Sequence, residues 1–153
     1  MTLRLATAGD LDAIMALERA SFPTDAWRES TMAAELTGEH GHYLVDEQEG
    51  RVVGYGGLRA LRGGSDADIQ TIALSPENRG RGRGRTLLRA LIAEAVSRGA
   101  RELFLEVRAD NPVAEGLYRS EGFAELGRRP RYYQPDDVDA IVMRLDLTTW
   151  SAE

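Results

Sequence analysis

The sequence predicts a mixed α/β fold, in which a central sheet of about seven strands packs against about four helices. Two observations support this fold class. Segments typical of strands and segments with helical spacing follow one another in the order β-α-α-β-β-β-α-β-α-β-β. The longest helical segment lies between the fourth and fifth strands, and such a connection joins two parallel strands by a right-handed crossover. We therefore expect a mixed α/β sandwich.

The composition limits the classes of function. With 153 residues, of which 42% are hydrophobic, the chain is expected to form a single domain over residues 1–153. Cysteine is absent, and the two histidines, His40 and His42, make no metal site without further ligands. The net charge of -6 argues against general binding of nucleic acid. Because no apolar run approaches transmembrane length and the N-terminus lacks a signal-peptide core, we expect no membrane partner and a cytoplasmic location. The oligomeric state stays open.

The N-terminal part predicts one strand and two helices. Alternation indicates a strand over residues 2–6, and helical spacing indicates a helix over 11–20. Pro23 interrupts that helix, and a second one is expected over 29–36 with Gly38 at its end. The stripe on the first helix consists of Leu11, Ile14, Met15, Leu17 and Glu18.

Three strands linked by turns should follow, over residues 43–46, 52–60 and 66–74. The second of them contains Gly54, Gly56 and Gly57, which predict a bulge or a close approach of another part of the backbone. With the first strand, these segments indicate an antiparallel half of the sheet.

Residues 72–98 predict a strand, a glycine-rich loop and a helix. Such a loop exposes backbone N–H groups at the positive end of the helix, which favours phosphate, and glycine lets the anion approach. The arginines concentrate positive charge here in an acidic chain, so we expect a bound anion, with a solvated basic turn as the alternative. The loop consists of Arg79, Gly80, Arg81, Gly82, Arg83, Gly84 and Arg85.

The C-terminal part predicts a strand, a short helix and two strands. Residues 102–108 alternate, with Glu106 on the less apolar face. Asn111 is a suitable N-cap for a helix that stops before Gly122. The last strands are expected over residues 123–133 and 138–147.

Five segments together resemble one family. Arg79 to Gly84 fits R-x-x-G-x-G, the pyrophosphate loop of the GNAT family of acetyl-CoA-dependent N-acetyltransferases. The segment LEVRADNPVAEGLYRSEGF, residues 105–123, is similar to a signature of its ribosomal-protein-alanine N-acetyltransferase branch. The other three segments are SFPTDAW (21–27), RYY (131–133) and DAIVM (139–143). The resemblance implies a GNAT fold, with the sheet splayed between strands 4 and 5, and acetyl-CoA as co-substrate without a metal.

The resemblance also implies roles for individual residues. Glu106 would be the general base, and Tyr118, twelve residues later, the general acid for the departing thiolate. The N–H of Leu74 would stabilise the developing oxyanion. Phe22, Trp27, Tyr132 and Tyr133 would build the acceptor pocket. The implied cofactor contacts are Ile72, Ala73, Leu74, the loop residues Arg79, Gly80, Arg81, Gly82, Arg83, Gly84 and Arg85, and Asn111.

The residues alone leave other interpretations open. Glu106 lies in an otherwise apolar strand, and burial there would favour the protonated form of a carboxylate, as a base requires. It could equally be a strand-end carboxylate paired with Arg108 or another neighbour. Tyr118, Phe22 and Trp27 could be core aromatics. Arg83, where the family often has an apolar residue, would contact phosphate or face solvent.

The function implied is transfer of an acetyl group from acetyl-CoA to a protein N-terminal α-amine by direct attack in a ternary complex. The acceptor would be the N-terminal alanine of a small-subunit ribosomal protein. A lysine side chain or a small-molecule amine is the alternative acceptor. A third alternative is a non-catalytic module that binds acetyl-CoA, against which the presence of both Glu106 and Tyr118 argues.

Overall fold

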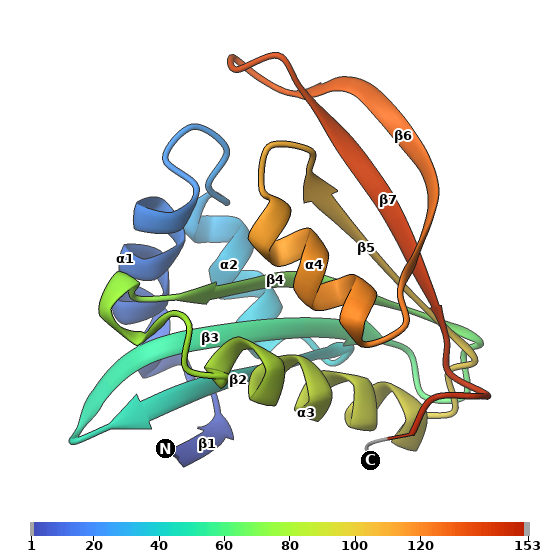
Figure 1. The fold of residues 1–153 in the computed structure, drawn as a ribbon. Coiled ribbons are helices and arrows are strands. Elements are labelled where there is room, and N and C mark those ends of the chain that lie inside the picture. The colour runs from blue at the N-terminus through green and yellow to red at the C-terminus, as the bar shows by residue number, and fades with distance from the viewer. Residues whose placement is uncertain (1, 152–153) are drawn as a thin grey trace.

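The fold is built on one mixed sheet, which a computed structural model describes for residues 2–151. The strand order is β1-β2-β3-β4-β5-β7-β6 (Figure 1). The strands are β1 (Thr2–Leu5), β2 (Gly41–Gln48), β3 (Arg51–Ala60), β4 (Asp66–Leu74), β5 (Glu102–Arg108), β6 (Ala124–Tyr133) and β7 (Val138–Asp146). The helices are α1 (Leu11–Ser21), α2 (Glu29–Thr37), α3 (Arg83–Ser97) and α4 (Pro112–Ser120), with short 3-10 turns at Ala8–Asp10 and Pro76–Asn78.

The predicted order of elements and the parallel pair of strands 4 and 5 are confirmed. β2 is longer than the predicted 43–46, because its ladder with β3 runs from Gly41 to Gln48. Among the described residues, no helix is both long and apolar enough to cross a membrane.

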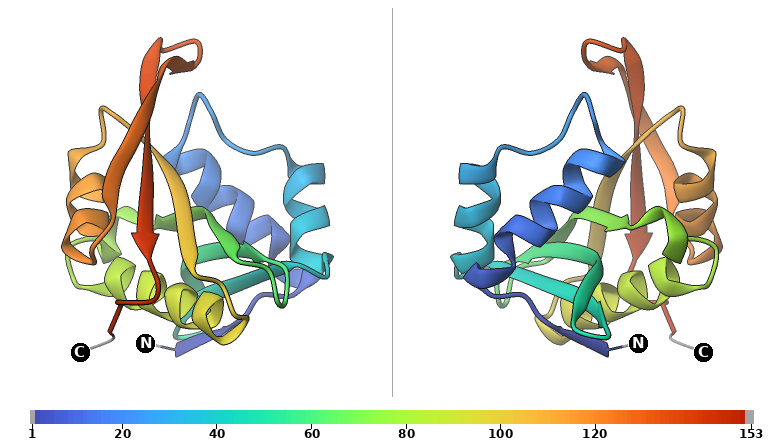
Figure 2. Two further views of the ribbon diagram at one scale, coloured as in Figure 1. Left: turned by 90° about the vertical axis from the view of Figure 1, so that its right-hand side faces the viewer. Right: turned by 90° about the vertical axis from the view of Figure 1, so that its left-hand side faces the viewer.

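The helices cover the sheet on both faces. α1 and α2 lie on one face, and α3 and α4 lie on the other (Figure 2). Each face has its own apolar core. One core gathers around α3, whose apolar stripe is buried, and the other joins α1 and α2 to β2 and β3. The stripe of α3 consists of Leu87, Leu88, Leu91, Ile92 and Ala95.

The glycines of β3 allow close packing on both of these faces. A Cβ at Gly54 would lie 2.4 Å from a methyl of Leu74, and one at Gly57 would lie 2.3 Å from the ring of Tyr43. The ladder with β4 also shifts register between Gly57 and Leu58. The predicted bulge is therefore present, whereas the closest approaches to Gly54 and Gly57 are made by side chains and not by backbone.

The sheet opens between β4 and β5. These parallel strands pair only at Asp66–Glu102, Ala67–Leu103 and Asp68–Phe104. Beyond them the strands diverge, as Figure 1 shows, whereas β5 stays paired with β7 along its whole length. The divergence leaves a gap in the sheet that side chains from both faces can line.

Candidate active site

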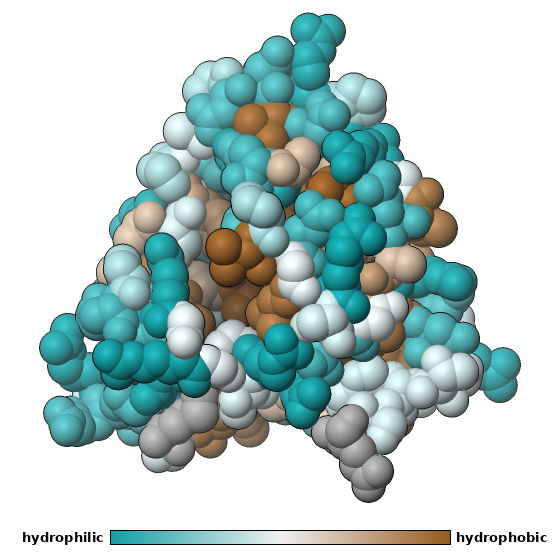
Figure 3. Space-filling model, viewed as in Figure 1, coloured by the Kyte–Doolittle hydropathy of each residue, from teal (hydrophilic) through white to brown (hydrophobic). Residues whose placement is uncertain are grey.

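A cavity of about 890 Å³ occupies the divergence of β4 and β5. Phe22 and Trp27 line it from the side of α1 and α2, and Ala114 and Tyr118 line it from the side of α4. Because these helices lie on opposite faces, the cavity connects the two faces of the sheet through the gap. Hydrophobic residues are visible in a hollow near the middle of the face in Figure 3, within a mostly hydrophilic surface.

The glycine-rich loop leads into the N-terminus of α3. Gly80 and Gly82 have φ angles of 76° and 79°, and Gly82 is the N-cap residue. The first intrahelical bond is donated by Thr86 N to Gly82 O at 3.1 Å. By helix geometry, the N–H groups of residues 83–85 therefore lack intrahelical acceptors. This arrangement suits a phosphate group, as the sequence pattern predicts.

Three of the four loop arginines are held by the protein itself. Arg79 donates to Leu74 O at 3.3 Å, and Arg85 pairs with buried Glu121 at the end of α4. Arg83 pairs with the fully buried carboxylate of Asp46 at 2.8 Å. The guanidinium of Arg83 therefore does not face solvent, because it pairs with Asp46 on β2. A contact of Arg83 with phosphate stays a prediction. Arg81 is exposed and makes no hydrogen bond or ion pair within residues 2–151.

The end of β4 presents backbone donors to the gap. Ser75 N donates to Val53 O of β3 at 2.8 Å. Since successive N–H groups of an extended strand point to opposite sides, the N–H groups of Ile72 and Leu74 face away from β3 and toward β5. Ala73, between them, is buried against the core of α1 and α2. Ile72 also lines the cavity.

Glu106 is less buried than its apolar strand predicts. Its side chain is 32% exposed and lies on the cavity wall, so the expectation of a buried carboxylate is wrong. The reason is the divergence of the strands, which leaves this position of β5 without a neighbour on β4. Its partner is Arg129 of β6, with Nε 3.4 Å from Oε2, and not Arg108.

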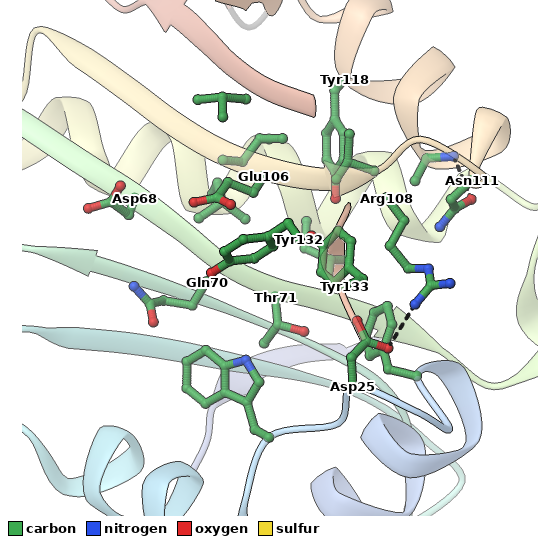
Figure 4. Close-up of a pocket in the computed structure, with 18 of the residues that line it drawn as sticks. Asp25, Asp68, Gln70, Thr71, Glu106, Arg108, Asn111, Tyr118, Tyr132 and Tyr133 are labelled. Carbon is green, nitrogen blue, oxygen red and sulfur yellow. Dashed lines mark hydrogen bonds and ion pairs between the residues drawn. The ribbon is translucent and has the colours of Figure 1, made fainter. Parts of the chain in front are cut away.

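Tyr118 lies on the buried face of α4. Its ring packs edge-on against Phe123 at 5.8 Å between centroids, and burial raises its pKa to about 12. Figure 4 shows its hydroxyl pointing toward the middle of the cavity, on the side where Glu106 and Tyr133 also lie. Asn111 caps α4 by accepting from Ala114 N at 3.3 Å, as expected, and it also lines the cavity.

Aromatic side chains form the wall opposite α4. Tyr132 and Tyr133 are T-shaped at 5.2 Å, and burial raises the pKa of Tyr133. The guanidinium of Arg129 lies 5.6 Å from the ring centre of Tyr132. Phe22 and Trp27 are half-buried, and each packs on the core of α1 and α2 while lining the cavity. The two residues are therefore part of a core and also line the cavity, and their contact with an acceptor stays a prediction.

Arg108 closes one end of this wall. It binds Asp25 at 3.3 Å, Asp110 at 2.9 Å and Asp136 at 2.9 Å (Figure 4 shows the contact with Asp25). Thr24 also donates to Asp136 at 2.6 Å. The hydrogen bond from Thr24, followed by that from Arg108, lowers the pKa of Asp136. The loop after α1 and the loop between β6 and β7 are thus joined over the cavity.

Sequence reasoning missed several cavity residues. The sequence did contain a signal for Glu18, because a carboxylate on the otherwise apolar stripe of α1 is unusual. Asp25 lies within the segment 21–27 that resembles the family, but nothing in that segment marks it as a partner of Arg108. Arg129 had no signal, since it meets Glu106 only through the tertiary fold. Asp68 also lines the cavity, where burial and then Asp66 raise its pKa. No cluster of His, Cys, Asp or Glu able to hold a metal occurs in the described part of the chain.

Comparison with known proteins gives a consistent result. Residues 11–123 match the acetyltransferase (GNAT) family. The N-alpha-acetyltransferase RimI of Mycobacterium tuberculosis is 38% identical over 149 residues, which cover 95% of this chain and 92% of the relative. The crystal structure of the Escherichia coli ribosomal-protein-S18-alanine N-acetyltransferase matches with a TM-score of 0.84 and 32% identity, over 99% of this chain and 97% of that one.

A Salmonella typhimurium structure of the acetyltransferase class, determined with its cofactor acetyl-CoA, matches with a TM-score of 0.82 and 25% identity. It covers 100% of this chain and 97% of the other. The splayed sheet, the loop at the start of α3 and these matches lead to one conclusion: the chain belongs to the GNAT family of N-acetyltransferases and resembles its ribosomal-protein-alanine branch.

Proposed function

We propose that the protein, as one domain over residues 1–153, transfers an acetyl group from acetyl-CoA to the N-terminal α-amine of a protein. The acceptor proposed is the N-terminal alanine of ribosomal protein bS18, the substrate named for the Escherichia coli relative. The observation that carries the proposal is the cavity through the sheet, which has Glu106 and Tyr118 on its walls and the backbone of β4 at its edge. A ribosomal acceptor would place the enzyme in the cytoplasm.

The cofactor end of the site follows from backbone geometry. The N–H groups at the start of α3 would bind the pyrophosphate, with Arg81 free to add a contact. The N–H of Ile72 would pair with an amide of the pantetheine arm, as a neighbouring strand would. Asn111, at the start of α4, would hydrogen-bond the same arm. Acetyl-CoA supplies the activated acetyl group as a thioester.

The acceptor end supplies proton transfer. Glu106 would take a proton from the acceptor ammonium, directly or through water, after Arg129 has moved away from it. The neutral amine then attacks the thioester carbon, and Leu74 N–H donates to the oxygen that becomes negative. The C–S bond breaks, and Tyr118 gives its proton to the departing sulfur. The attacking nitrogen loses its second proton as the amide forms, which restores the Tyr118 hydroxyl, and Glu106 releases the first proton to solvent. The products are an acetylated amine and free CoA.

The test compares acceptors side by side. The protein is incubated with acetyl-CoA and a peptide that begins with the bS18 terminus, a peptide with a blocked N-terminus and an internal lysine, or a polyamine, and the products are identified by mass spectrometry. We expect acetylation of the alanine α-amine only. Modification of the lysine or polyamine in preference to the alanine peptide would contradict the proposed acceptor while leaving the family intact.

A further inference from the structure

The strongest unassigned feature is a buried carboxylate on the wall of the acceptor cavity. Glu18 lies on α1 with 1% of its surface exposed, yet it lines the same cavity as Glu106. Burying a carboxylate is costly unless its charge is compensated, so its partners decide what it can do. The chemistry derived above gives it no role.

Glu18 accepts hydrogen bonds from three separate segments. Its Oε2 accepts from the backbone N–H of Trp27 at 3.0 Å, after the end of α1. Its Oε1 accepts from the hydroxyl of Thr71 on β4 at 3.1 Å and from the hydroxyl of Tyr55 on β3. These donors satisfy an ionised carboxylate without neutralising it. Burial, followed by the charge of Glu18, raises the pKa of Tyr55 and keeps its hydroxyl a donor.

No basic side chain balances this charge. Within residues 2–151, Glu18 forms no ion pair, whereas Glu106 pairs with Arg129 and Asp25 pairs with Arg108. The remaining carboxylate on the cavity wall, Asp68, is far more exposed than Glu18, and solvent screens exposed charges more than buried ones. Its partial burial and the charge of Asp66 raise its pKa, which favours its neutral form. Glu18 is thus the buried, uncompensated negative charge of the cavity.

A cation that enters the cavity would supply the missing balance. The α-amine of a protein has a pKa of about 8, so it arrives as an ammonium at neutral pH. Two arginines also line the cavity, and both already have partners. Arg129 is held by Glu106 and by the ring of Tyr132, and Arg108 is held by three aspartates, Asp25, Asp110 and Asp136. We propose that Glu18 is a substrate-positioning residue, whose buried charge draws the acceptor ammonium into the cavity. This inference rests on the proposed function.

Glu18 and Glu106 would therefore act at different stages of the reaction. The charge of Glu106 is neutralised in the free protein, so it gains little from an acceptor until Arg129 leaves. The charge of Glu18 acts from the start and is fixed by its hydrogen bonds. Glu18 therefore contributes to acceptor binding, and Glu106 contributes to the chemical step.

The Glu18→Gln variant removes the charge and retains the shape. The amide oxygen can accept from Trp27 N, and the amide nitrogen can donate to the oxygen of Thr71 or Tyr55, because both hydroxyls rotate. Glu18→Asp is the matched control, since it disturbs the hydrogen bonds but keeps the charge. Thermal unfolding and acetyl-CoA titration of both variants report the structural effect separately.

The measurement is the preference for a free amine over a blocked one. An alanine-initiated peptide and its Nα-acetylated form are titrated into the protein saturated with CoA, by calorimetry. We expect the wild type and Glu18→Asp to bind the free-amine peptide more tightly than the acetylated one. In Glu18→Gln the ratio of the two affinities should fall about tenfold, which equals about 1.4 kcal/mol. The difference between wild type and Glu18→Gln should disappear above about pH 9, where the amine is neutral.

Three results would overturn the inference: an undiminished preference in Glu18→Gln, an equal loss in Glu18→Asp, or a loss that persists when the amine is neutral. A wild type that does not distinguish the two peptides would also overturn it. A wild type that prefers the free amine but acetylates no alanine peptide would instead reject the proposed function and leave the role of Glu18 intact. The two failures are therefore distinguishable.

Discussion

At the scale of single residues, Glu102 offers a control for Glu106, because both glutamates lie on the same face of β5. Glu106 lies on the cavity wall, and Glu102 pairs with Arg144 outside it. Glu106→Gln should lower turnover by roughly 100- to 10,000-fold, the usual contribution of a general base, with acetyl-CoA affinity unchanged. Glu102→Gln should leave turnover as it is. Steady-state rates and calorimetric titration measure both.

The pH dependence of the Glu106→Gln defect tests its cause. As the pH rises past about 8, the acceptor amine loses its proton without help, so the defect should shrink. A defect of constant size between neutral and alkaline pH would assign Glu106 a structural role.

The proton of Tyr118 should stay available over a wide range. Because burial raises its pKa to about 12, activity should not fall between about pH 8 and pH 10 through loss of this proton. Tyr118→Phe should slow the chemical step roughly 100-fold and leave acetyl-CoA binding nearly intact. Tyr43→Phe is the control, because it removes a buried hydroxyl that has no hydrogen-bond partner in the described chain. Single-turnover rates that are equal in Tyr118→Phe and wild type would exclude the general-acid role.

At the scale of elements, the start of α3 is the proposed phosphate site. Gly82→Asp places a negative charge at this helix N-terminus, so acetyl-CoA affinity should fall at least about tenfold. Gly63→Asp is matched in backbone strain, with a φ of 80° against 79°, but lies in the loop between β3 and β4. Both variants should lose similar stability on heating, and only Gly82→Asp should lose affinity by calorimetry. Equal acetyl-CoA affinities in the two variants would contradict the assignment of the pyrophosphate to this loop.

An element can be predicted from the sequence when the residues that determine it are close together in the chain. Asn111 before Pro112 fixes the start of α4, and the stripe of α3 fixes its buried face, so both could be predicted from neighbouring residues. The contact of Arg83 with Asp46 joins positions 37 apart, and no local pattern marks it.

In the candidate site, too, some features could be predicted from the sequence and others depend on the tertiary fold. The motif residues identified the two walls of the cavity, because the family resemblance implied a sheet splayed between β4 and β5. The exposure of Glu106 could not be predicted from the apolar strand around it. It depends on where β4 turns away and on Arg129 reaching across from β6.

At the scale of the whole molecule, the composition bears on the order of the chemical steps. Cysteine is absent, so we expect direct transfer in a ternary complex, with initial-rate lines that intersect. The 19 basic residues are all arginines, so the protein has no lysine side chain that acetyl-CoA could acetylate non-enzymatically. Protein incubated with acetyl-CoA alone should show no acetyl adduct by mass spectrometry apart from any at its own N-terminus. Parallel lines with a competent acetyl-enzyme would overturn direct transfer.

The opening between β4 and β5 has a consequence for the handling of the protein. Past Asp68 and Phe104, the facing sides of the two strands have no strand partner across the gap, and such edges are templates for pairing with another chain. Most sheets confine this hazard to their outer strands, whereas here it lies in the middle of the sheet. A ligand that pairs with β4 would cover the exposed edge. Protein stored without acetyl-CoA should therefore aggregate sooner on warming, as light scattering would record.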